Sequence, residues 1–546
     1  MPSDLSPSPS KSPALLPALM AVGSGWTVLV GGFCALRPDE VLARVVAGGI
    51  EALGHPAGEY VIAVEHATSG QTWLVSSDHG FVPWYYAVVA RKLVHGPTVR
   101  EVMDRAGLPF EWNWRAVGDF FSYGHAMGED SMHPRVVRVP IASVVHARAG
   151  NVDIQQRDYD VIHPIRPHTA DEAVEAFNRS VGRWLNEAPA VSMSGGLDAR
   201  VVLSALLKLG ARPALLSGGQ NGAHDVEIPR SIADQLGLNF VHVALDVDDY
   251  LQVGDLAVRL TGGSKAAHHW HTLLYPLKSG FGRDQLLYVG NAGEFARTQR
   301  LRIGSVVHAL APLPGGRTHE LYWRIALPSH PFRSNEVSAM SGALGAQLVR
   351  AAHRDRATRM AQRSVGAFLD GLDRFTLQER PRGFQGLGYQ LYAHSTSPRM
   401  PFVDTDWATA ARGLPRRIRL GSNWHRYCIQ KNAPKLMNFP EGSRYARVPE
   451  KAPAFWWLHM AQRRDVPYAD YAAWFRSSRI LDWLLDHRGS LQELIPPPLL
   501  EKMLQEQRDQ GGRHGLVGSL LALAFWRNTG DGRAPSTENE QPRFST

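Results

Sequence analysis

The stretch from Val191 to Arg200 constrains the fold more than any other part of this chain. It runs from an apolar segment, through Gly195 and Gly196, into a segment whose apolar residues recur at helical spacing. A strand that turns on glycines directly into a helix is the repeating unit of parallel sheets covered by helices. We therefore expect a doubly wound α/β domain around this turn.

The flanking sequence continues the alternation of strands and helices. The expected elements are a helix from about Ala170 to Asn186, strands Ala190 to Met193 and Ala214 to Leu216, a helix near Asp225 to Leu236, and strands Phe240 to Leu245 and Gln285 to Val289. Such alternation predicts a parallel sheet that binds ligands at the carboxyl ends of its strands. The remainder, to about Asn528, reads as mostly helical and rich in arginine.

The region before this domain has a different character. From about Gly25 to Ala149 it carries short β-like runs divided by turns, which indicates an all-β or α+β module. These runs include Trp26 to Val30, Tyr60 to Glu65 and Thr72 to Val75. We expect a disordered leader over 1–20, an N-terminal domain over 21–160, a second domain over 161–528 and a disordered tail over 529–546.

Composition excludes several classes of protein. With 44% hydrophobic and 20% charged residues in 546, the chain is neither disordered nor fibrous. The net charge of +8 comes from scattered cations without a basic run, so we expect no nucleic-acid partner. Cys34 and Cys428 cannot build a disulfide framework, which favours a reduced, cytoplasmic protein. The uncharged stretch Ser12 to Leu36 is broken by prolines and glycines, so we expect no membrane anchor.

The glycine turn is suited to phosphate chemistry. Gly195 and Gly196 allow the backbone to approach a polyphosphate, Ser194 can donate a hydroxyl hydrogen bond, and the helix that starts at Leu197 offers unpaired N–H groups. Asp198 would repel phosphate unless a divalent cation bridges them, which points to Mg²⁺. The alternative is an ordinary strand-to-helix turn in which Asp198 caps the helix. The spacing excludes a lysine-containing P-loop and a dinucleotide fingerprint.

Ser194 to Asp198 resembles the pyrophosphate loop of ATP pyrophosphatases, and its surroundings are similar to the asparagine synthetase-like amide ligases. The further matching positions are Asp225, Val289 to Glu294, Met400 to Asp404, Gly58 to Tyr60, Asp78, Gly80, Pro83, Tyr85 and Tyr86. The resemblance spans about Gly25 to Glu441. It implies an α+β amidohydrolase-like N-terminal domain, then a doubly wound parallel-sheet ATP pyrophosphatase domain with a helical C-terminal part.

The resemblance also assigns roles to residues. It implies ATP bound at the loop Ser194, Gly195, Gly196, Leu197 and Asp198, with Leu216, Ser217 and Gly290 also at the nucleotide, and Mg²⁺ on Asp198 and Glu294. Two positions depart from the family: Ala199 replaces a serine, and Glu294 replaces an aspartate. The family's catalytic lysine would fall near Ser422 or Asn423, yet no lysine lies between Lys278 and Lys431. The candidates to replace or assist it are Lys265, Arg399, His425, Arg426 and, for substrate contact or helix capping, Asp404.

The N-terminal domain lacks the family's glutaminase nucleophile. Val28 stands on the strand where a working glutaminase has its terminal cysteine, and Cys34 lies six residues later. We therefore expect no ammonia from glutamine and an amine supplied by the substrate itself. Among the relatives that join two groups of one substrate, lasso peptide cyclases and β-lactam synthetases, we favour the cyclase. In that interpretation an Asp or Glu side chain of a precursor peptide is adenylated and captured by the peptide α-amine.

Other functions stay open. One is an amidotransferase-related ligase that acts on a small molecule or a surface polysaccharide, and another is an inactive nucleotide-binding scaffold. Beyond the precursor peptide, a leader-peptide protease or recognition protein is an expected partner. We expect the loop Thr261 to His271, with His268, His269 and His271, and the segment Phe455 to Trp457 to line a substrate cleft rather than to bind metal.

Overall fold

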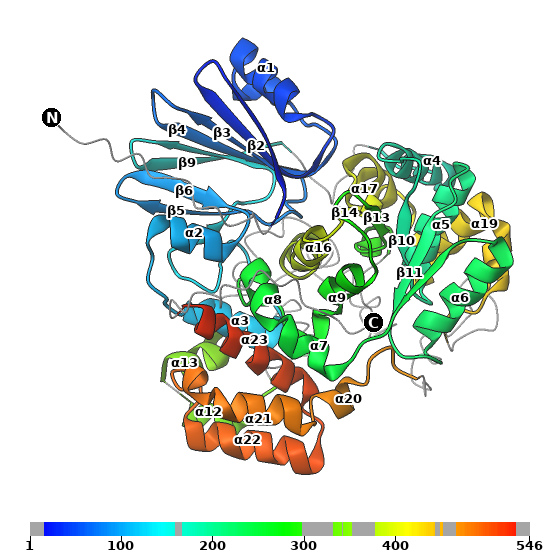
Figure 1. Cartoon of the computed structure of the whole chain (residues 1–546). Helices are drawn as coiled ribbons and strands as arrows, with labels where there is room; N and C mark the ends of the chain where they lie inside the picture. The colour runs from blue at the N-terminus through cyan, green and yellow to red at the C-terminus, as the bar shows by residue number, and fades with distance from the viewer. Residues whose placement is uncertain are drawn as a thin grey trace, which may run out of the picture.

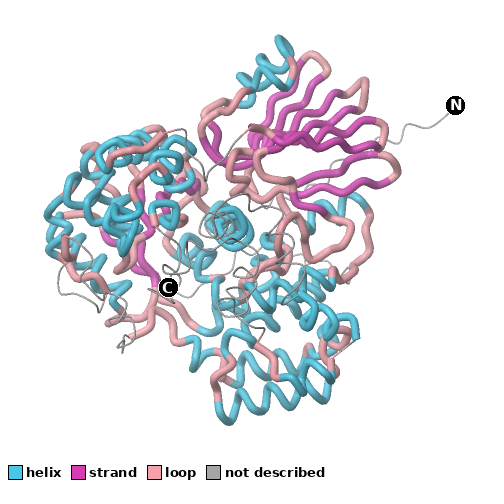
Figure 2. The backbone as a smooth tube through the Cα atoms, turned by 180° about the vertical axis from the view of Figure 1, so that it is seen from behind, coloured by secondary structure: helices cyan, strands magenta, loops and turns pink. Residues whose placement is uncertain are grey.

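The computed structural model describes residues 16–158, 166–297, 331–340, 342–351, 377–442, 448–450 and 466–530. Figure 1 shows three parts: an N-terminal β-rich domain, a parallel sheet with helices, and a helical C-terminal part. Seen from behind in Figure 2, the strands are confined to the first two parts. This is the fold class expected from the sequence. Within the described residues, no helix has the length and apolar character needed to cross a bilayer.

The N-terminal domain is built on a six-stranded antiparallel sheet with the order β1-β2-β3-β4-β8-β9. Its strands are β1 (Ala18–Gly23), β2 (Trp26–Cys34), β3 (Gly58–His66), β4 (Gln71–Ser76), β8 (Ser143–Arg148) and β9 (Asn151–Gln156). A smaller sheet has the order β6-β5-β7, from β5 (Tyr85–Val89), β6 (Lys92–Gly96) and β7 (Val137–Arg138). The three expected runs fall within β2, β3 and β4. The end of the expected leader overlaps β1, which begins at Ala18 and pairs with β2.

The second domain holds a five-stranded parallel sheet with the order β12-β11-β10-β13-β14. Its strands are β10 (Ala190–Ser192), β11 (Ala214–Gly218), β12 (Phe240–Val243), β13 (Leu286–Val289) and β14 (Ser397–Arg399). The chain first adds strands on one side of β10 and then returns to add β13 and β14 on the other. The strand order therefore reverses between β10 and β13, and open α/β sheets bind ligands at such a switch point.

Helices of the second domain cover both faces of this sheet or follow its strands. They include α4 (Ala170–Gly182), α5 (Leu197–Lys208), α6 (His224–Leu236), α7 (Val247–Gln252), α8 (Gly254–Thr261), α9 (His271–Lys278), α16 (Gly386–Ala393), α17 (Thr405–Arg412) and α19 (Asn423–Asn432). The helical part contains α12 (Ser334–Ala339), α13 (Gly342–Ala351), α20 (Tyr471–Trp474), α21 (Ser478–Asp486), α22 (Pro497–Gln510) and α23 (His514–Gly530). The N-terminal domain adds α1 (Pro38–Gly48), α2 (Val99–Ala106) and α3 (Trp114–Tyr123).

The helix α16 lies where the three parts meet (Figure 1). Its Gln390 donates a side-chain hydrogen bond to the Pro97 carbonyl oxygen in the N-terminal domain. Just before α16, the Arg382 carbonyl oxygen accepts a hydrogen bond of 2.7 Å from Arg138, a buried arginine of β7. These buried polar contacts fix the N-terminal domain against the second domain at the side of the parallel sheet where the site is built.

An aromatic cluster fastens α4 to the C-terminal half of the second domain. The Phe177 ring is fully buried, and its centroid lies 4.7 Å from Phe402, 5.4 Å from Trp407 and 5.7 Å from Trp424.

We predict that Phe177→Ala lowers the free energy of unfolding by about 3–5 kcal/mol, because it removes a buried ring and leaves a cavity. Urea denaturation measures this change. The matched control is Leu19→Ala, because Leu19 is 61% exposed and exposed substitutions change stability by about 0.5 kcal/mol or less. Equal effects of the two changes would contradict the packing described.

Candidate functional site

The loop between β10 and α5 is held from the side by α6. The Gly195 N–H donates a hydrogen bond of 2.8 Å to Asp225 Oδ1, in the first turn of α6. The Ser217 hydroxyl, at the end of β11, donates to the carbonyl oxygen of the same aspartate. Gly196 is exposed, and its N–H lies 3.3 Å from Ser194 Oγ. The structure thus brings the expected loop residues together with Ser217.

The start of α5 is open to a ligand. Gly196 is the N-cap residue of α5, and no side chain forms a capping hydrogen bond there. Asp198 therefore does not act as the helix cap that the alternative interpretation of the turn requires. Uncapped N–H groups and the positive end of the helix dipole favour an anion at this position.

The loop after β13 packs directly on this helix start. A Cβ atom on Gly290 would lie 2.7 Å from the Ala199 nitrogen, and one on Gly293 would lie 2.5 Å from Asp198 Cγ. Any residue larger than glycine would push the two loops apart. The close approach places the segment that carries Glu294 against Asp198, as the sequence led us to expect.

Asp198 is surrounded by basic groups. Its Oδ1 atom forms an ion pair with Arg297 Nη2 and lies 3.0 Å from His425 Nε2. Burial alone would raise the pKa of this carboxyl, but the Arg297 charge and the His425 ring outweigh it and hold the pKa below its ordinary value. Burial lowers the pKa of His425 to about 4, so this ring is neutral at neutral pH.

Glu294 is oriented by an amide from another segment. Gln385 Nε2 lies 3.2 Å and 3.3 Å from the two carboxylate oxygens. Gln385 ends a π-helical turn, Pro381–Gln385, directly before α16. Such turns are rare and are frequent at functional sites. The turn therefore links Glu294 to the junction of the three parts.

The donor set fits a magnesium ion that is shared with a nucleotide. Asp198 and Glu294 supply hard oxygen ligands, and the Asp198 side chain is 29% exposed. No group of three or more His, Cys, Asp or Glu side chains gathers into a metal cage among the described residues. Mg²⁺ is commonly held by one or two carboxylates plus phosphate oxygens and water, so two protein ligands suffice.

A buried arginine supports the loop from below. Arg200 Nη2 donates to the Pro440 carbonyl oxygen at 2.6 Å and contacts the Gly195 carbonyl oxygen at 3.4 Å. Burial lowers the pKa of Arg200 to about 10, which leaves it charged at neutral pH. Nearby, Arg426 pairs with Glu441 at 2.6 Å, so this sequence candidate is engaged in the C-terminal segment rather than at Asp198.

Lys265 lies on the other side of the π-helical turn. Its Nζ donates a hydrogen bond of 2.9 Å to the Phe384 carbonyl oxygen and lies 3.7 Å from the centre of the Phe384 ring. Burial lowers the pKa of Lys265 to about 7. Phe384 and Gln385 are adjacent, so consecutive residues connect Lys265 with Glu294.

The neighbouring histidines are packed among aromatic rings. His269 contacts the Phe384 ring, with centroids 4.7 Å apart, and His271 Nδ1 lies 3.2 Å from the Tyr471 hydroxyl. Burial lowers the pKa of His271 to about 4, so its ring is neutral at neutral pH. Tyr275 donates a hydrogen bond of 3.0 Å to the Gly218 carbonyl oxygen, which ties this aromatic cluster to the end of β11.

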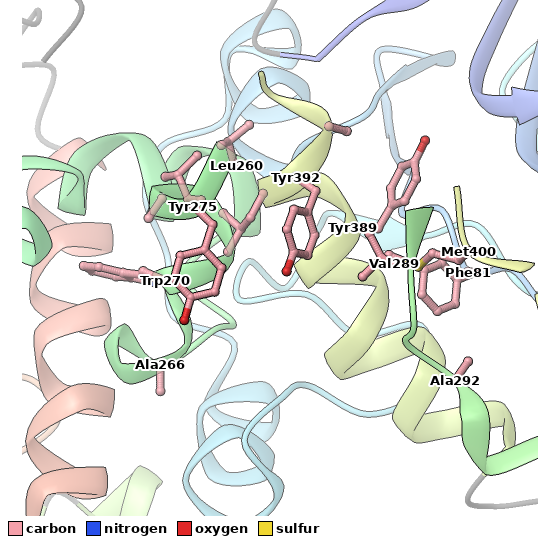
Figure 3. Close-up of a cluster of buried hydrophobic side chains, with 14 of the residues drawn as sticks. Phe81, Leu260, Ala266, Trp270, Tyr275, Val289, Ala292, Tyr389, Tyr392 and Met400 are labelled. Carbon is pink, nitrogen blue, oxygen red and sulfur yellow. The ribbon is translucent and has the colours of Figure 1, made fainter. Parts of the chain in front are cut away.

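The cluster also reaches the end of β10. Figure 3 shows Tyr275 and Tyr392 among buried side chains on neighbouring helices, together with Trp270. The Tyr392 hydroxyl lies 3.4 Å from Ser192 Oγ, the last residue of β10. The helices α9, which follows the loop Thr261 to His271, and α16 thus reach the carboxyl ends of β11 and β10. The segment Phe455 to Trp457 lies outside the described residues.

Two other candidates have packing roles in the structure. The Arg399 guanidinium lies beside the ring pair of Phe33 and Trp184, 5.3 Å and 5.2 Å from their centroids. Asp404 accepts a hydrogen bond of 3.3 Å from the Trp407 N–H as the N-cap of α17 and pairs with Arg183. Neither residue forms a described hydrogen bond or ion pair with the Ser194 to Asp198 loop.

The N-terminal domain offers no reactive thiol in its described part. The Val28 side chain is fully buried in β2. Cys34 ends the same strand, and burial raises the pKa of its thiol to about 11, so the thiolate is scarce at neutral pH. A free cysteine in such an environment packs as a small apolar side chain.

Glu59 is an ionisable residue in the core of the N-terminal domain. Its carboxyl is fully buried and accepts hydrogen bonds from the Ser77 hydroxyl at 2.6 Å and the Phe81 N–H at 2.9 Å. Burial nevertheless raises the pKa of Glu59 to about 8. The next turn, at Asp78, accepts a hydrogen bond of 3.1 Å from Thr405 of α17, so this region touches the second domain.

No known family model matches the chain, and no curated protein is significantly similar to it. The structure establishes an α/β protein with an N-terminal antiparallel-sheet domain and a parallel-sheet domain. Membership of the asparagine synthetase-like amide ligases is a proposal that rests on the sequence resemblance.

The sequence does not predict three contacts of the site, which are made by Arg297, Gln385 and Tyr392. Arg297 lies three residues after Glu294, so its proximity to that loop could have been read from the spacing alone. Gln385 and Tyr392 gave no such signal, because they reach Glu294 and Ser192 from segments far along the chain.

We predict a pH-dependent effect of Glu59→Gln on stability. The native pKa of about 8 lies above the ordinary value of 4.5, so the native state binds this proton more tightly than the unfolded state. The contribution of Glu59 is therefore fully present below the unfolded pKa and is lost as pH rises through the native one. Urea denaturation at about pH 5 and about pH 8 should show Glu59→Gln gaining free energy of unfolding relative to wild type as pH rises. A difference between the two proteins that does not change with pH would contradict the burial of an uncharged carboxyl.

Proposed function

We propose that this protein is an ATP-dependent, AMP-forming amide ligase. The observation that carries the proposal is the meeting of two carboxylate-bearing loops, Asp198 and Glu294, at the uncapped start of α5. This meeting lies at the switch point between β10 and β13, the position where sheets of this kind bind nucleotides.

In this proposal the polyphosphate binds over Ser194, Gly195, Gly196 and Leu197. Asp198 and Glu294 would hold Mg²⁺, which would supply positive charge to balance the phosphates. The adenine lies near Leu216 and Ser217, with Gly290 completing the nucleotide site. The fixed positions of Gly195 and Ser217, both tied to Asp225, support this arrangement.

The reaction joins a carboxylate to an amine in two steps. A substrate carboxylate oxygen attacks the α-phosphorus, and the bond to the leaving pyrophosphate breaks. The amine then attacks the acyl carbon, AMP leaves, and the amine gives up a proton. The protein contributes positioning and fixed charge, which are the main catalytic terms for such transfers.

Lys265 is the catalytic candidate best connected to this site. The turn at Phe384 and Gln385 joins it to Glu294. With a pKa of about 7, Lys265 is present in both protonation states at neutral pH and is suited to take up the proton that the amine loses. Arg399 and Asp404 support the fold around the site through their contacts with Trp184 and α17.

The substrate we favour is a peptide that supplies both groups, as in a lasso peptide cyclase in the cytoplasm. Supporting this, the described N-terminal domain has Val28 in place of a nucleophile and a Cys34 whose pKa disfavours the thiolate. An amine on the same molecule has a large effective concentration, which a ligase without its own ammonia supply requires. The other proposed partner is a protein that recognises or removes the leader of the precursor.

Two observations favour a second candidate, an inactive nucleotide-binding scaffold. Asp198 is already neutralised by Arg297, and Ala199 replaces the serine of the family. A scaffold of this kind would bind ATP without forming AMP.

We predict that Asp198→Ala and Glu294→Ala each abolish ATP cleavage to AMP and pyrophosphate, because each removes a metal ligand. Pyrophosphate release measures the activity, and thermal melting checks that the variants stay folded, as expected for a side chain that is 29% exposed in the case of Asp198. The control is Asp255→Ala, which also removes an aspartate paired with an arginine, here Arg259 at 2.7 Å on α8, and should retain activity. Full activity in either site variant would refute the metal assignment.

The substrate is tested by incubating the protein with ATP, Mg²⁺ and a processed precursor peptide. We predict a product lighter by one water, with one carboxylate oxygen transferred to AMP. Consumption of free ammonia or of a sugar acid, with no mass loss in any peptide, would instead assign the protein to the polysaccharide-amidating ligases. ATP binding without AMP in any mixture would favour the scaffold.

We also predict that glutamine yields no ammonia and that Cys34→Ala leaves ligase activity unchanged, because the thiol is partly buried and its raised pKa keeps it protonated at neutral pH. Ammonia release is measured with and without ATP. Release that disappears in Cys34→Ala would show that the N-terminal domain retains a working nucleophile.

A further inference from the structure

Arg297 connects the two helix starts that form the site. It follows the 3-10 turn η3 (Gly293–Ala296), its Nη2 pairs with Asp198 on α5, and its Nε donates a hydrogen bond of 2.9 Å to Ser422 Oγ. Ser422 directly precedes α19, the helix whose His425 also contacts Asp198. The guanidinium therefore bridges the start of α19 and the start of α5.

Arg297 both balances the charge of Asp198 and has N–H donors to offer a ligand. Arg297 Nη2 forms an ion pair with Asp198 Oδ1, so the guanidinium charge balances the carboxylate. A guanidinium has five N–H donors. Among the residues that the structure describes, Nη2 contacts Asp198 and Nε contacts Ser422, and no hydrogen bond of Nη1 is described. The Arg297 side chain is 29% exposed, so a ligand at the start of α5 can reach it.

We propose that Arg297 is a phosphate-binding residue that exchanges partners when the nucleotide binds. Without nucleotide it neutralises Asp198. When the metal-bound polyphosphate arrives, the divalent cation takes Asp198, and the guanidinium turns to the phosphate oxygens while Nε stays on Ser422. The inference rests on the nucleotide site proposed above, and the planar fork of arginine matches phosphate oxygens.

The exchange of partners and a purely structural role predict different effects of removing Arg297. Arg297→Met removes the phosphate partner, so ATP should bind more weakly. The same substitution removes the cation that competes for Asp198, so a divalent metal alone should bind more tightly. An arginine that merely supports the loop would, when lost, weaken both.

The experiment measures both equilibria on the full chain. Isothermal titration with ATP at saturating Mg²⁺ should show binding to Arg297→Met weakened about tenfold or more, the effect of losing a charge-assisted hydrogen bond. Electron paramagnetic resonance with Mn²⁺ and no nucleotide should show tighter metal binding than in wild type. Arg297→Lys, which keeps the charge and loses the fork, should bind ATP with intermediate affinity. Arg259→Met removes an arginine from the pair with Asp255 and should change neither equilibrium.

The outcomes separate this inference from the proposed reaction. Unchanged ATP binding in Arg297→Met, or Mn²⁺ binding that is unchanged or weaker, would overturn the role of Arg297 even if the wild-type protein forms AMP. The expected shifts in a protein that never forms AMP would support Arg297 and refute the ligase reaction. Absence of ATP binding in the wild type would overturn both.

Discussion

The site depends on how closely the loops that leave β10 and β13 approach each other. Gly290 and Gly293 lie so near the first turn of α5 that a single added carbon would overlap Ala199 or Asp198. This contact places the loop that carries Glu294 against the helix start that carries Asp198. Because the strand order reverses between β10 and β13, the rest of the sheet leaves this corner free for a ligand.

The π-helical turn before α16 contacts the N-terminal domain, Lys265 and the loop that carries Glu294. Within five residues, Pro381–Gln385, it contacts the N-terminal domain through Arg382, Lys265 through Phe384, and Glu294 through Gln385. The turn thus couples the two domains to the proposed metal ligand and to the buried lysine.

The sequence predicted the elements that have strong hydrophobic patterns. The four strands β10 to β13 and the helices α4 to α6 agree with their expected positions to within a few residues, because buried parallel strands and amphipathic helices follow clear periodicities. The strand β14 escaped notice because Ser397–Arg399 has no apolar run. The expected leader over 1–20 overlaps the first residues of β1 (Ala18–Gly23), whose pairing with β2 follows from the two-residue hairpin turn Ser24 and Gly25, both with positive φ.

The site was predictable in its loops but less so in its charges. Ser194 to Asp198 and Glu294 could be found because glycines and carboxylates follow strands in a pattern with a chemical meaning. The ion pair of Asp198 could not be found this way. The spacing places Arg297 near the loop that carries Glu294, but its contact with Asp198, 99 residues away in sequence, forms only in the tertiary fold. Likewise, the environment of Lys265 depends on Phe384, a contact across 119 residues that no local pattern encodes.

We propose that Asp198 and Glu294 hold a nucleotide-bound divalent cation at the start of α5. Anomalous diffraction from crystals grown with Mn²⁺ and a non-hydrolysable ATP analogue tests this most directly. We expect a manganese peak in contact with both carboxylates and phosphate oxygens over Gly196. A nucleotide or metal bound elsewhere, with Arg297 still paired to Asp198, would contradict it.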